Sequence, residues 1–153
     1  MGDLETYSID CAIERATTLI ADGEAKCVVI KGDRIVATYI GIGLRPILEI
    51  YRNHPEAMME GAIVDKVIGR AAAFVAINGG AKLVYGLLMS ESAKELLEAH
   101  NIEVRYDLLA PEILNRERTD LCPLERSVRG ESDPTTAMER IYKQIEILMN
   151  NKK

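Results

Sequence analysis

An acid and a base stand side by side inside a strongly apolar stretch of the sequence. Asp65 and Lys66 interrupt the run GAIVDKVIGRAAAFVAINGG, which covers residues 61–80. The spacing of its apolar residues predicts one long buried helix over residues 61–77. A charge in such a helix is costly unless it meets a partner, water or a ligand. In the structural interpretation, Asp65 favours the positive start of the helix and Lys66 extends outward to solvent.

The functional interpretation places the same two residues in a cleft. Asp65 would then bind a ligand, and the Lys66 ammonium would act as a catalytic or anion-holding group. Gly69 follows shortly after and has no side chain, so a ligand or another segment could approach the backbone there.

A second polar motif, MSES at residues 89–92, follows an apolar segment and precedes a helical pattern. Ser90 is typical of a helix N-cap, and Glu91 suits the positive end of the helix dipole. The free N–H groups of such a helix start also bind anions or carbonyl oxygens. We therefore expect Ser90 to cap the helix or bind a ligand, and Glu91 to be the best-placed carboxylate for acid–base catalysis.

The irregular segment over residues 110–126 adds further candidates. Cys122 stands at the start of a helical turn, where the pKa of a thiol is lowered, so it is a candidate nucleophile. A single cysteine with no histidine nearby in sequence is more often a small buried hydrophobe. Glu125 can cap the same turn. Asn115 and Arg116 offer amide and guanidinium groups to a phosphate or carboxylate, unless they are ordinary loop residues in water.

The composition limits the class of function. Apolar residues make up 48% of the chain, charged residues 28%, and the net charge is −5 with both signs interspersed. This balance permits a substantial core and argues against general binding to nucleic acid or to an anionic membrane, since both need a basic face. The three cysteines are widely spaced, which favours reduced thiols in the cytoplasm.

The order of elements predicts an α/β fold. The predicted elements are helices over 7–21, 45–53, 61–77 and 91–101, a hairpin over 26–41, strands over 82–88 and 102–109, and a final helix from Pro134. A hairpin followed by alternating helices and strands predicts a three-layer arrangement, with a mixed sheet of about four or five strands between helices. No linker or repeat divides the chain, so we expect one domain over residues 1–153, including a C-terminal helical extension over 134–153.

This order resembles the cytidine deaminase-like fold. In that fold, one helix begins with His-x-Glu or Cys-x-Glu and a second begins with Pro-Cys-x-x-Cys, and together they hold a zinc ion. The corresponding positions here carry VDK at 64–66 and MSES at 89–92, without His or Cys. Activation of water by zinc needs three such ligands and a glutamate. The sequence therefore argues against a zinc deaminase of the usual type, and we expect neither a metal nor another cofactor.

Five segments in the same order are similar to DUF1893, an uncharacterised prokaryotic family that has the deaminase-like fold without the zinc ligands. These segments are CVVIKGDRIV, GIGLRPILEIY, GAIVDKVIGRAAA, GGAKLVYGLLMSESAKELL and NRERTDLCPLE. The resemblance implies the fold and implies no particular reaction.

Two functions remain open at this point. The first is a metal-free site for a nucleotide-like or other polar anionic small molecule, where the helices of 61–77 and 91–100 begin. Its candidate catalytic residues are Lys66, Glu91 and Cys122, and its candidate binding residues are Asp65, Ser90, Asn115, Arg116 and Glu125. Whether the site catalyses a reaction is open. The second is an inactive structural or regulatory protein that acts through oligomerisation, for example as a homodimer through the apolar stripe of the last helix.

Overall fold

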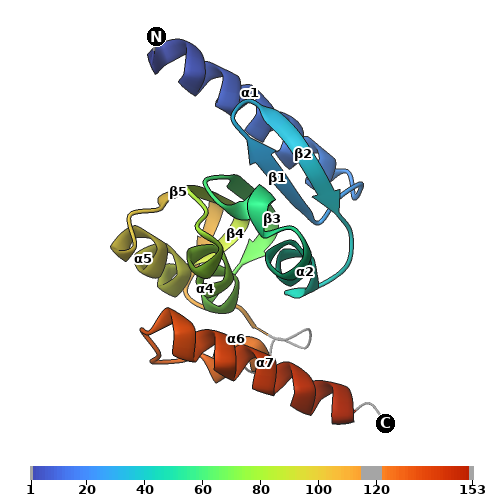
Figure 1. The fold of residues 1–153 in the computed structure, drawn as a ribbon, viewed down its shortest axis with the longest axis vertical. Helices are drawn as coiled ribbons and strands as arrows, with labels where there is room; N and C mark the ends of the chain where they lie inside the picture. The colour runs from blue at the N-terminus through green and yellow to red at the C-terminus, as the bar shows by residue number, and fades with distance from the viewer. Residues whose placement is uncertain (1, 115–121, 152–153) are drawn as a thin grey trace.

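The computed structural model describes residues 2–114 and 122–151, with side chains over 9–114 and 122–150 (Figure 1). The helices are α1 (Gly2–Ala21), α2 (Arg45–Asn53), α3 (Pro55–Met58), α4 (Arg70–Gly79), α5 (Glu91–Ala99), α6 (Pro123–Ser127) and α7 (Pro134–Asn151). The strands are β1 (Cys27–Lys31), β2 (Arg34–Tyr39), β3 (Ala62–Ile68), β4 (Leu83–Ser90) and β5 (Glu103–Ala110).

The strands form one mixed sheet in the order β2-β1-β3-β4-β5. β1 pairs antiparallel with both β2 and β3, whereas β3, β4 and β5 run parallel to one another. The α/β fold with a mixed sheet that the sequence predicts is confirmed. The carboxyl ends of β3 and β4 lead into α4 and α5, so both helices begin at the same edge of the sheet.

The single helix predicted over residues 61–77 is wrong in its N-terminal part. Residues Ala62–Ile68 form the central strand β3, and the helix begins only at Arg70. β3 is covered on both faces, because Ile63 packs into one core cluster and Val64 into the other. A strand that is apolar on both faces lacks the alternation that identifies a half-buried strand. A one-residue connection, Gly69, then joins it to α4 with no turn signal between them.

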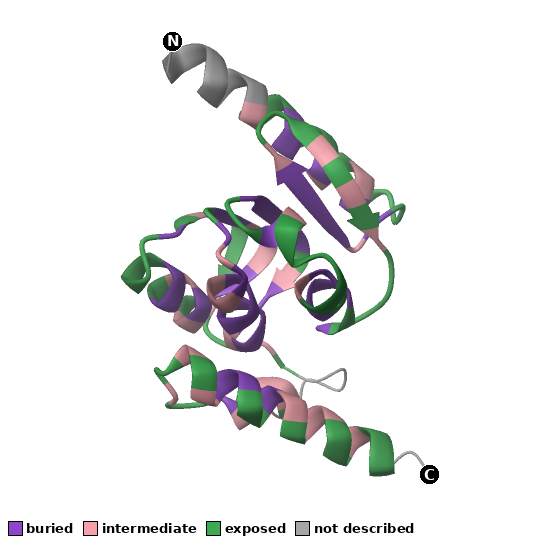
Figure 2. Cartoon of the chain, in the orientation of Figure 1, coloured by how far each residue is buried: buried purple, intermediate pink, exposed green. Residues whose placement is uncertain are grey.

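Helices cover both faces of the sheet, as predicted. α1 packs Ile13, Ala16 and Ile20 against one face, while α2, α4 and α5 cover the other. Figure 1 shows α7 beyond α4, on the side away from the sheet, and Figure 2 shows that α4 is buried on nearly every side. The predicted apolar stripe of α7 faces the interior, since Ala137 and Ile141 are fully buried in the same core cluster as α4.

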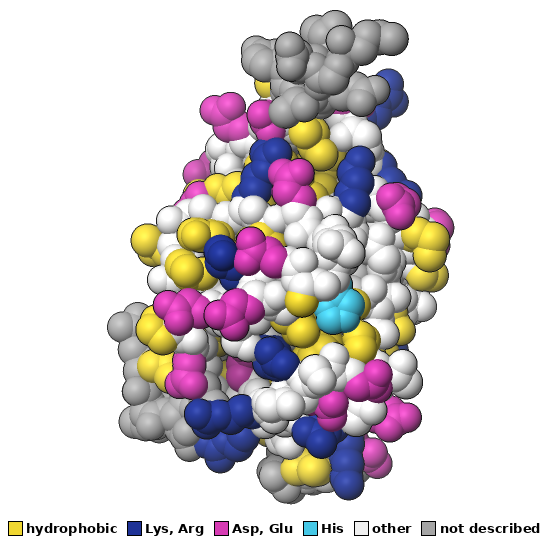
Figure 3. Space-filling view, turned by 90° about the vertical axis from the view of Figure 1, so that its left-hand side faces the viewer, with side chains coloured by type: hydrophobic (Ala, Val, Ile, Leu, Met, Phe, Trp, Pro, Cys, Tyr) yellow, Lys and Arg dark blue, Asp and Glu magenta, His cyan; other side chains and the backbone are white. Residues whose placement is uncertain are grey.

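Local signals in the sequence set the predicted turns and helix ends. Gly32 takes a positive φ of 62° in the β1–β2 hairpin, and Gly80 ends α4 in the left-handed conformation with φ 75°. Asp133 caps α7, where its Oδ2 accepts from the Thr136 N–H at 2.9 Å. Within the described residues, no helix has both the length and the apolar character needed to cross a bilayer. The face shown in Figure 3 carries acidic, basic and hydrophobic side chains interspersed.

Candidate functional site

Asp65 lies in the middle of the sheet, where it forms an ion pair with Lys26. We call these two residues the sheet pair. Asp65 is 1% exposed, and its Oδ1 is 2.5 Å from the Lys26 Nζ, which also donates to the Gly43 carbonyl at 3.0 Å. Lys66, the neighbour of Asp65 in sequence, is exposed. The partner of the Asp65 carboxylate is therefore Lys26, the residue just before β1, and not the adjacent Lys66.

The sheet pair is a closed cluster. Burial raises the pKa of the Asp65 carboxyl above its ordinary value, although Lys26 and the Val67 N–H oppose the shift. Burial also raises the pKa of the Cys27 thiol well above its ordinary range, with the nearby Asp65 charge adding to the effect. The thiol of Cys27 is therefore protonated at neutral pH, and these groups hold β1, β3 and the Gly43 loop together.

The start of α4 is occupied by a carboxylate from α6. The N–H groups of Arg70 and Ala71 donate to the two oxygens of Glu125, each at 2.7 Å. Gly69 makes this contact possible, because a Cβ at that position would overlap the Glu125 carboxylate. Burial raises the pKa of Glu125, and the two N–H donors oppose that shift. The predicted close approach at Gly69 is present, and the group that approaches is a side chain of the protein itself.

Arg70 connects the starts of α4 and α5 to the C-terminal segment. Its Nη1 donates to the Ser92 Oγ at 2.7 Å, its Nε donates to the Val128 carbonyl at 3.1 Å, and its Nη2 donates to the Glu131 carbonyl. The guanidinium also lies over the Phe74 ring, 5.2 Å from its centroid. We call Arg70, Ser92 and Glu125 the helix-start cluster.

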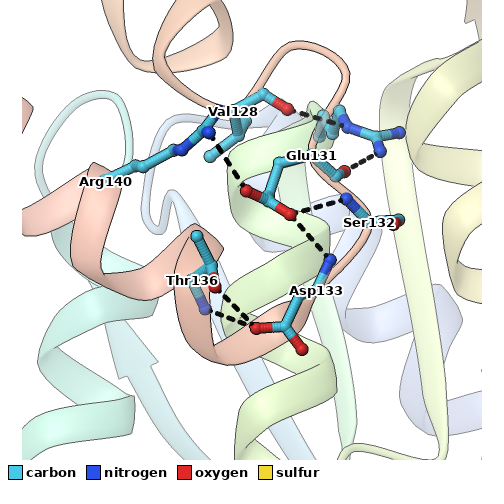
Figure 4. A network of polar contacts seen from close by, with 7 residues as sticks. Val128, Glu131, Ser132, Asp133, Thr136 and Arg140 are labelled. Carbon is cyan, nitrogen blue, oxygen red and sulfur yellow. Dashed lines mark hydrogen bonds and ion pairs between the residues drawn. The ribbon is translucent and has the colours of Figure 1, made fainter.

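The loop between α6 and α7 is held in place by a second polar network (Figure 4). One oxygen of the Glu131 carboxylate accepts from the N–H groups of Ser132 and Asp133, each at 3.1 Å, and the other lies 3.3 Å from Arg140. Asp133 in turn caps α7 through Thr136. These contacts fix the loop that carries Arg129 and Gly130.

The start of α5 is capped as predicted. Ser90 is 1% exposed, and its Oγ accepts from the Ala93 N–H at 3.1 Å. A hydroxyl that accepts one hydrogen bond can still donate another. The first-turn N–H groups of a helix have no acceptor within the helix, so α5 also presents a positive end here.

A cavity of about 270 Å³ lies where these groups meet. Its lining residues are Arg70, Ser90, Ser92, Pro111, Glu112, Ile113, Glu125, Arg129 and Gly130. The cavity therefore has two guanidinium groups and two hydroxyls. Of its two carboxylates, Glu125 is engaged by the start of α4, and Glu112 lies 3.7 Å from the Arg129 guanidinium. Arg70 already donates to Ser92, Val128 and Glu131. The groups with most capacity left to bind a ligand are therefore the Ser90 and Ser92 hydroxyls and the Arg129 guanidinium, which lies beyond hydrogen-bond distance of Glu112.

Two of the eight predicted site residues, Ser90 and Glu125, line this cavity. Four others do not: Asp65 is in the sheet pair, Lys66 and Glu91 are exposed, and Cys122 is half-buried at the start of α6. Asn115 and Arg116 lie outside the described residues.

Of the seven lining residues outside the predicted set, three carry side-chain donors: Arg70, Ser92 and Arg129. Arg70 is the only basic residue of the apolar run after Lys66, and it becomes a helix-start residue once the helix is placed correctly after Gly69. Ser92 stands inside the MSES motif, so the signal was available. Nothing in the sequence marks Arg129, because its position depends on the loop between α6 and α7.

The donor set at the two helix starts does not fit a zinc ion. It consists of a guanidinium, two hydroxyls and a carboxylate that already accepts from two N–H groups. Within the part of the chain that the structure describes, no group of three or more His, Cys, Asp and Glu side chains is arranged to hold a metal.

Comparison with solved structures shows the same fold in a crystal structure of a DUF1893 family protein from Thermotoga maritima. The TM-score is 0.78 with 20% sequence identity, over 87% of this chain and 89% of that one. A diaminohydroxyphosphoribosylaminopyrimidine deaminase/5-amino-6-(5-phosphoribosylamino)uracil reductase, also from Thermotoga maritima, gives a TM-score of 0.48 with 20% identity, over 80% of this chain and 41% of that one. No curated protein matches the chain in sequence. The model of the family described as Domain of unknown function (DUF1893) matches residues 15–145, so the chain belongs to the DUF1893 family.

Proposed function

We propose that this protein binds a small molecule with an anionic group, a phosphate or a carboxylate, in the cavity between the starts of α4 and α5. The observation that carries the proposal is the convergence of Arg70 and Arg129 on that cavity beside the Ser90 and Ser92 hydroxyls. Guanidinium groups suit phosphate and carboxylate because their planar fork can donate two parallel hydrogen bonds.

The position of the cavity supports the same function. α4 and α5 start directly after β3 and β4, so the cavity lies outside the carboxyl ends of parallel strands. Ligands of open α/β sheets bind preferentially at this edge. A volume of about 270 Å³ is near the small end of the range for small-molecule sites, so a compact ligand or a nucleotide-like molecule held by one end is favoured.

Glu125 determines where the anionic group binds. Its carboxylate already satisfies the first N–H groups of α4, so a second anion at that helix start would be repelled. Arg129 and the start of α5 remain as the favourable region. The Ser92 hydroxyl accepts from Arg70 and can donate its own hydrogen to the ligand. Binding in this scheme requires no metal ion.

Binding can be tested by thermal shift and calorimetry with nucleoside monophosphates, sugar phosphates and small carboxylic acids. A compound that binds the folded state alone should raise Tm in a concentration-dependent way. Arg129→Ala should weaken the binding of that compound by about ten- to hundredfold, since a hydrogen bond to a charged group contributes about 1.5–3 kcal/mol. It should leave the Tm of the free protein nearly unchanged, because Arg129 is exposed.

Arg34→Ala is the matched control, because Arg34 is also an exposed arginine but lies at the β1–β2 hairpin and does not line the cavity. The proposal fails if no compound in the panel binds. It also fails if Arg129→Ala and Arg34→Ala change the affinity equally.

A further inference from the structure

β5 is a regular strand at the edge of the sheet, and no strand in the described part of the chain pairs with its outer side. Within the described residues, β5 ends the sheet and pairs with β4 in a parallel register that does not shift between Leu83↔Glu103 and Ser90↔Ala110. The opposite edge differs, because the pairing of β2 with β1 contains a register shift between Val29 and Ile30. Bulges of this kind discourage edge-to-edge pairing, whereas a long regular edge favours it.

The backbone of β5 shows which groups face outward. The N–H of Glu103 donates to the Lys82 carbonyl at 3.0 Å, so the backbone groups of Glu103 point toward β4. Successive residues of a strand point their N–H and C=O groups to opposite sides. Those of Val104, Tyr106 and Leu108 therefore face the outer edge, ready to accept another strand.

The side chains along this edge are unusually apolar for exposed positions. Tyr106 is 38% exposed, Leu108 67% and Leu109 39%. On the face shared by Val104, Tyr106 and Leu108, Val104 continues into the core. On the other face, Arg105 bonds to Asp10 of α1 at 2.6 Å and to Glu103 at 2.8 Å, and Asp107 accepts from the Tyr85 hydroxyl. The strand thus has one apolar face and a second face on which charged residues are followed by Leu109.

Charge decides the register in which β5 could pair with its own copy. In an antiparallel pair of β5 strands, each outward-facing residue must lie opposite an outward-facing residue of the second copy, so the two-fold axis passes at a residue and not between two residues. The two registers that pair the most residues place this axis at Tyr106 or at Asp107. With the axis at Asp107, two carboxylates face each other, which is unfavourable. With the axis at Tyr106, Arg105 faces Asp107 of the second copy on both sides of the axis. Val104 then faces Leu108 of the second copy on the apolar face.

We propose that the protein forms a homodimer by antiparallel pairing of β5 with β5 of a second copy, with the two-fold axis at Tyr106. The two sheets then form one continuous sheet. The backbone N–H of Tyr106 in each copy donates to the backbone carbonyl of Tyr106 in the other, and two Arg105–Asp107 pairs flank this centre. A partner with charge of a single sign fits this edge less well, because Arg105 and Asp107 have opposite charges.

Charge reversal tests both the dimer and its register. The wild-type chain should sediment as a dimer in analytical ultracentrifugation. Arg105→Asp places aspartate opposite aspartate, and Asp107→Arg places arginine opposite arginine, so each variant should raise the dimer Kd by at least about tenfold. An equimolar mixture of the two variants should restore the dimer, because every facing pair then has opposite charges.

Leu108→Lys and Ile40→Lys test which edge of the sheet forms the dimer. This test leaves Arg105 unchanged, which matters because Arg105 also bonds to Asp10 of α1. Both replace a strongly exposed hydrophobic residue, Leu108 on β5 and Ile40 just after β2, which is 75% exposed. Leu108→Lys should weaken the dimer and Ile40→Lys should not. A monomeric wild-type chain overturns the proposal. So does a dimer that survives Leu108→Lys, or one that the mixture of charge-reversed variants fails to restore.

Discussion

The sheet pair and the helix-start cluster both place charge inside the protein, but they differ in what lies beside the charge. Asp65 is enclosed between β1, β3 and the Gly43 loop, and its partner Lys26 is 11% exposed. Arg70 and Glu125 are also bonded to the protein, yet they line a cavity together with Arg129. A buried charge is thus a poor indicator of a binding site unless open space and spare donors adjoin it.

The largest expected effect concerns the sheet pair. Lys26→Met removes the only cation bonded to the Asp65 carboxylate among the described residues, and it should lower the free energy of unfolding by about 3–5 kcal/mol near neutral pH. Urea denaturation followed by circular dichroism measures this loss. Lys66→Met is the matched control, because the exposed Lys66 should contribute less than about 0.5 kcal/mol. Equal losses in the two variants would contradict the structural role of Lys26.

The pH dependence of the same variant tests the cause of the loss. Burial raises the pKa of Asp65 above its ordinary value of 3.8, and removal of Lys26, which lowers it, raises it further. A raised folded-state pKa gives stability that is full below the unfolded-state pKa and is lost as pH rises through the folded-state value. The deficit of Lys26→Met should therefore shrink as pH falls toward 3.8. A deficit that is constant with pH would show that packing, not charge, causes it.

An intermediate effect is expected where Glu125 caps α4. Glu125→Gln and Gly69→Ala should each lower the free energy of unfolding by about 1–3 kcal/mol, because each disrupts the bonds to the Arg70 and Ala71 N–H groups. The double variant should lose much less than the two losses added together, since both changes remove the same contact. Additive losses would mean that Gly69 is needed for some other reason.

The smallest effect is expected at the start of α5. Ser90→Ala removes the bond to the Ala93 N–H and should lower the free energy of unfolding by about 1 kcal/mol. Ser132→Ala is the control, because the Ser132 side chain is exposed and should have little effect on stability. If the Ser90 hydroxyl also binds the ligand, Ser90→Ala should lower the affinity for that ligand. If Ser90 only caps α5, the affinity should stay unchanged.

The sequence was informative where a local signal determined the structure. The hairpin at Gly32, the cap at Ser90 and the start of α7 at Pro134 each follow from residues within a few positions. β3 was missed because both of its faces are buried, so its pattern merges with that of α4. The β-branched residues of AIVDKVI, set against the alanines after Arg70, carried a composition signal that separates the strand from the helix.

The candidate site was harder to predict because its groups come from distant segments. The polar motif at Ser90 identified the region. The predicted cap by Glu125 of its own turn is wrong, because its carboxylate accepts from the first N–H groups of α4 instead. The partner of Asp65 is 39 positions away, and Arg70 meets Glu131 across 61 positions. Such pairs depend on the order of strands in the sheet and on the path of the loop before α7, and no local pattern encodes either.

The three anchors of Arg70 also link the stability of the cavity to that of the last helix. If α7 detaches, the carbonyls of Val128 and Glu131 leave the guanidinium, and the loop with Arg129 and Gly130 leaves the cavity wall. Amide hydrogens at the start of α7 and of α4 should then exchange with solvent through one shared opening event. Occupation of the cavity would slow exchange in α7, although no ligand atom touches that helix.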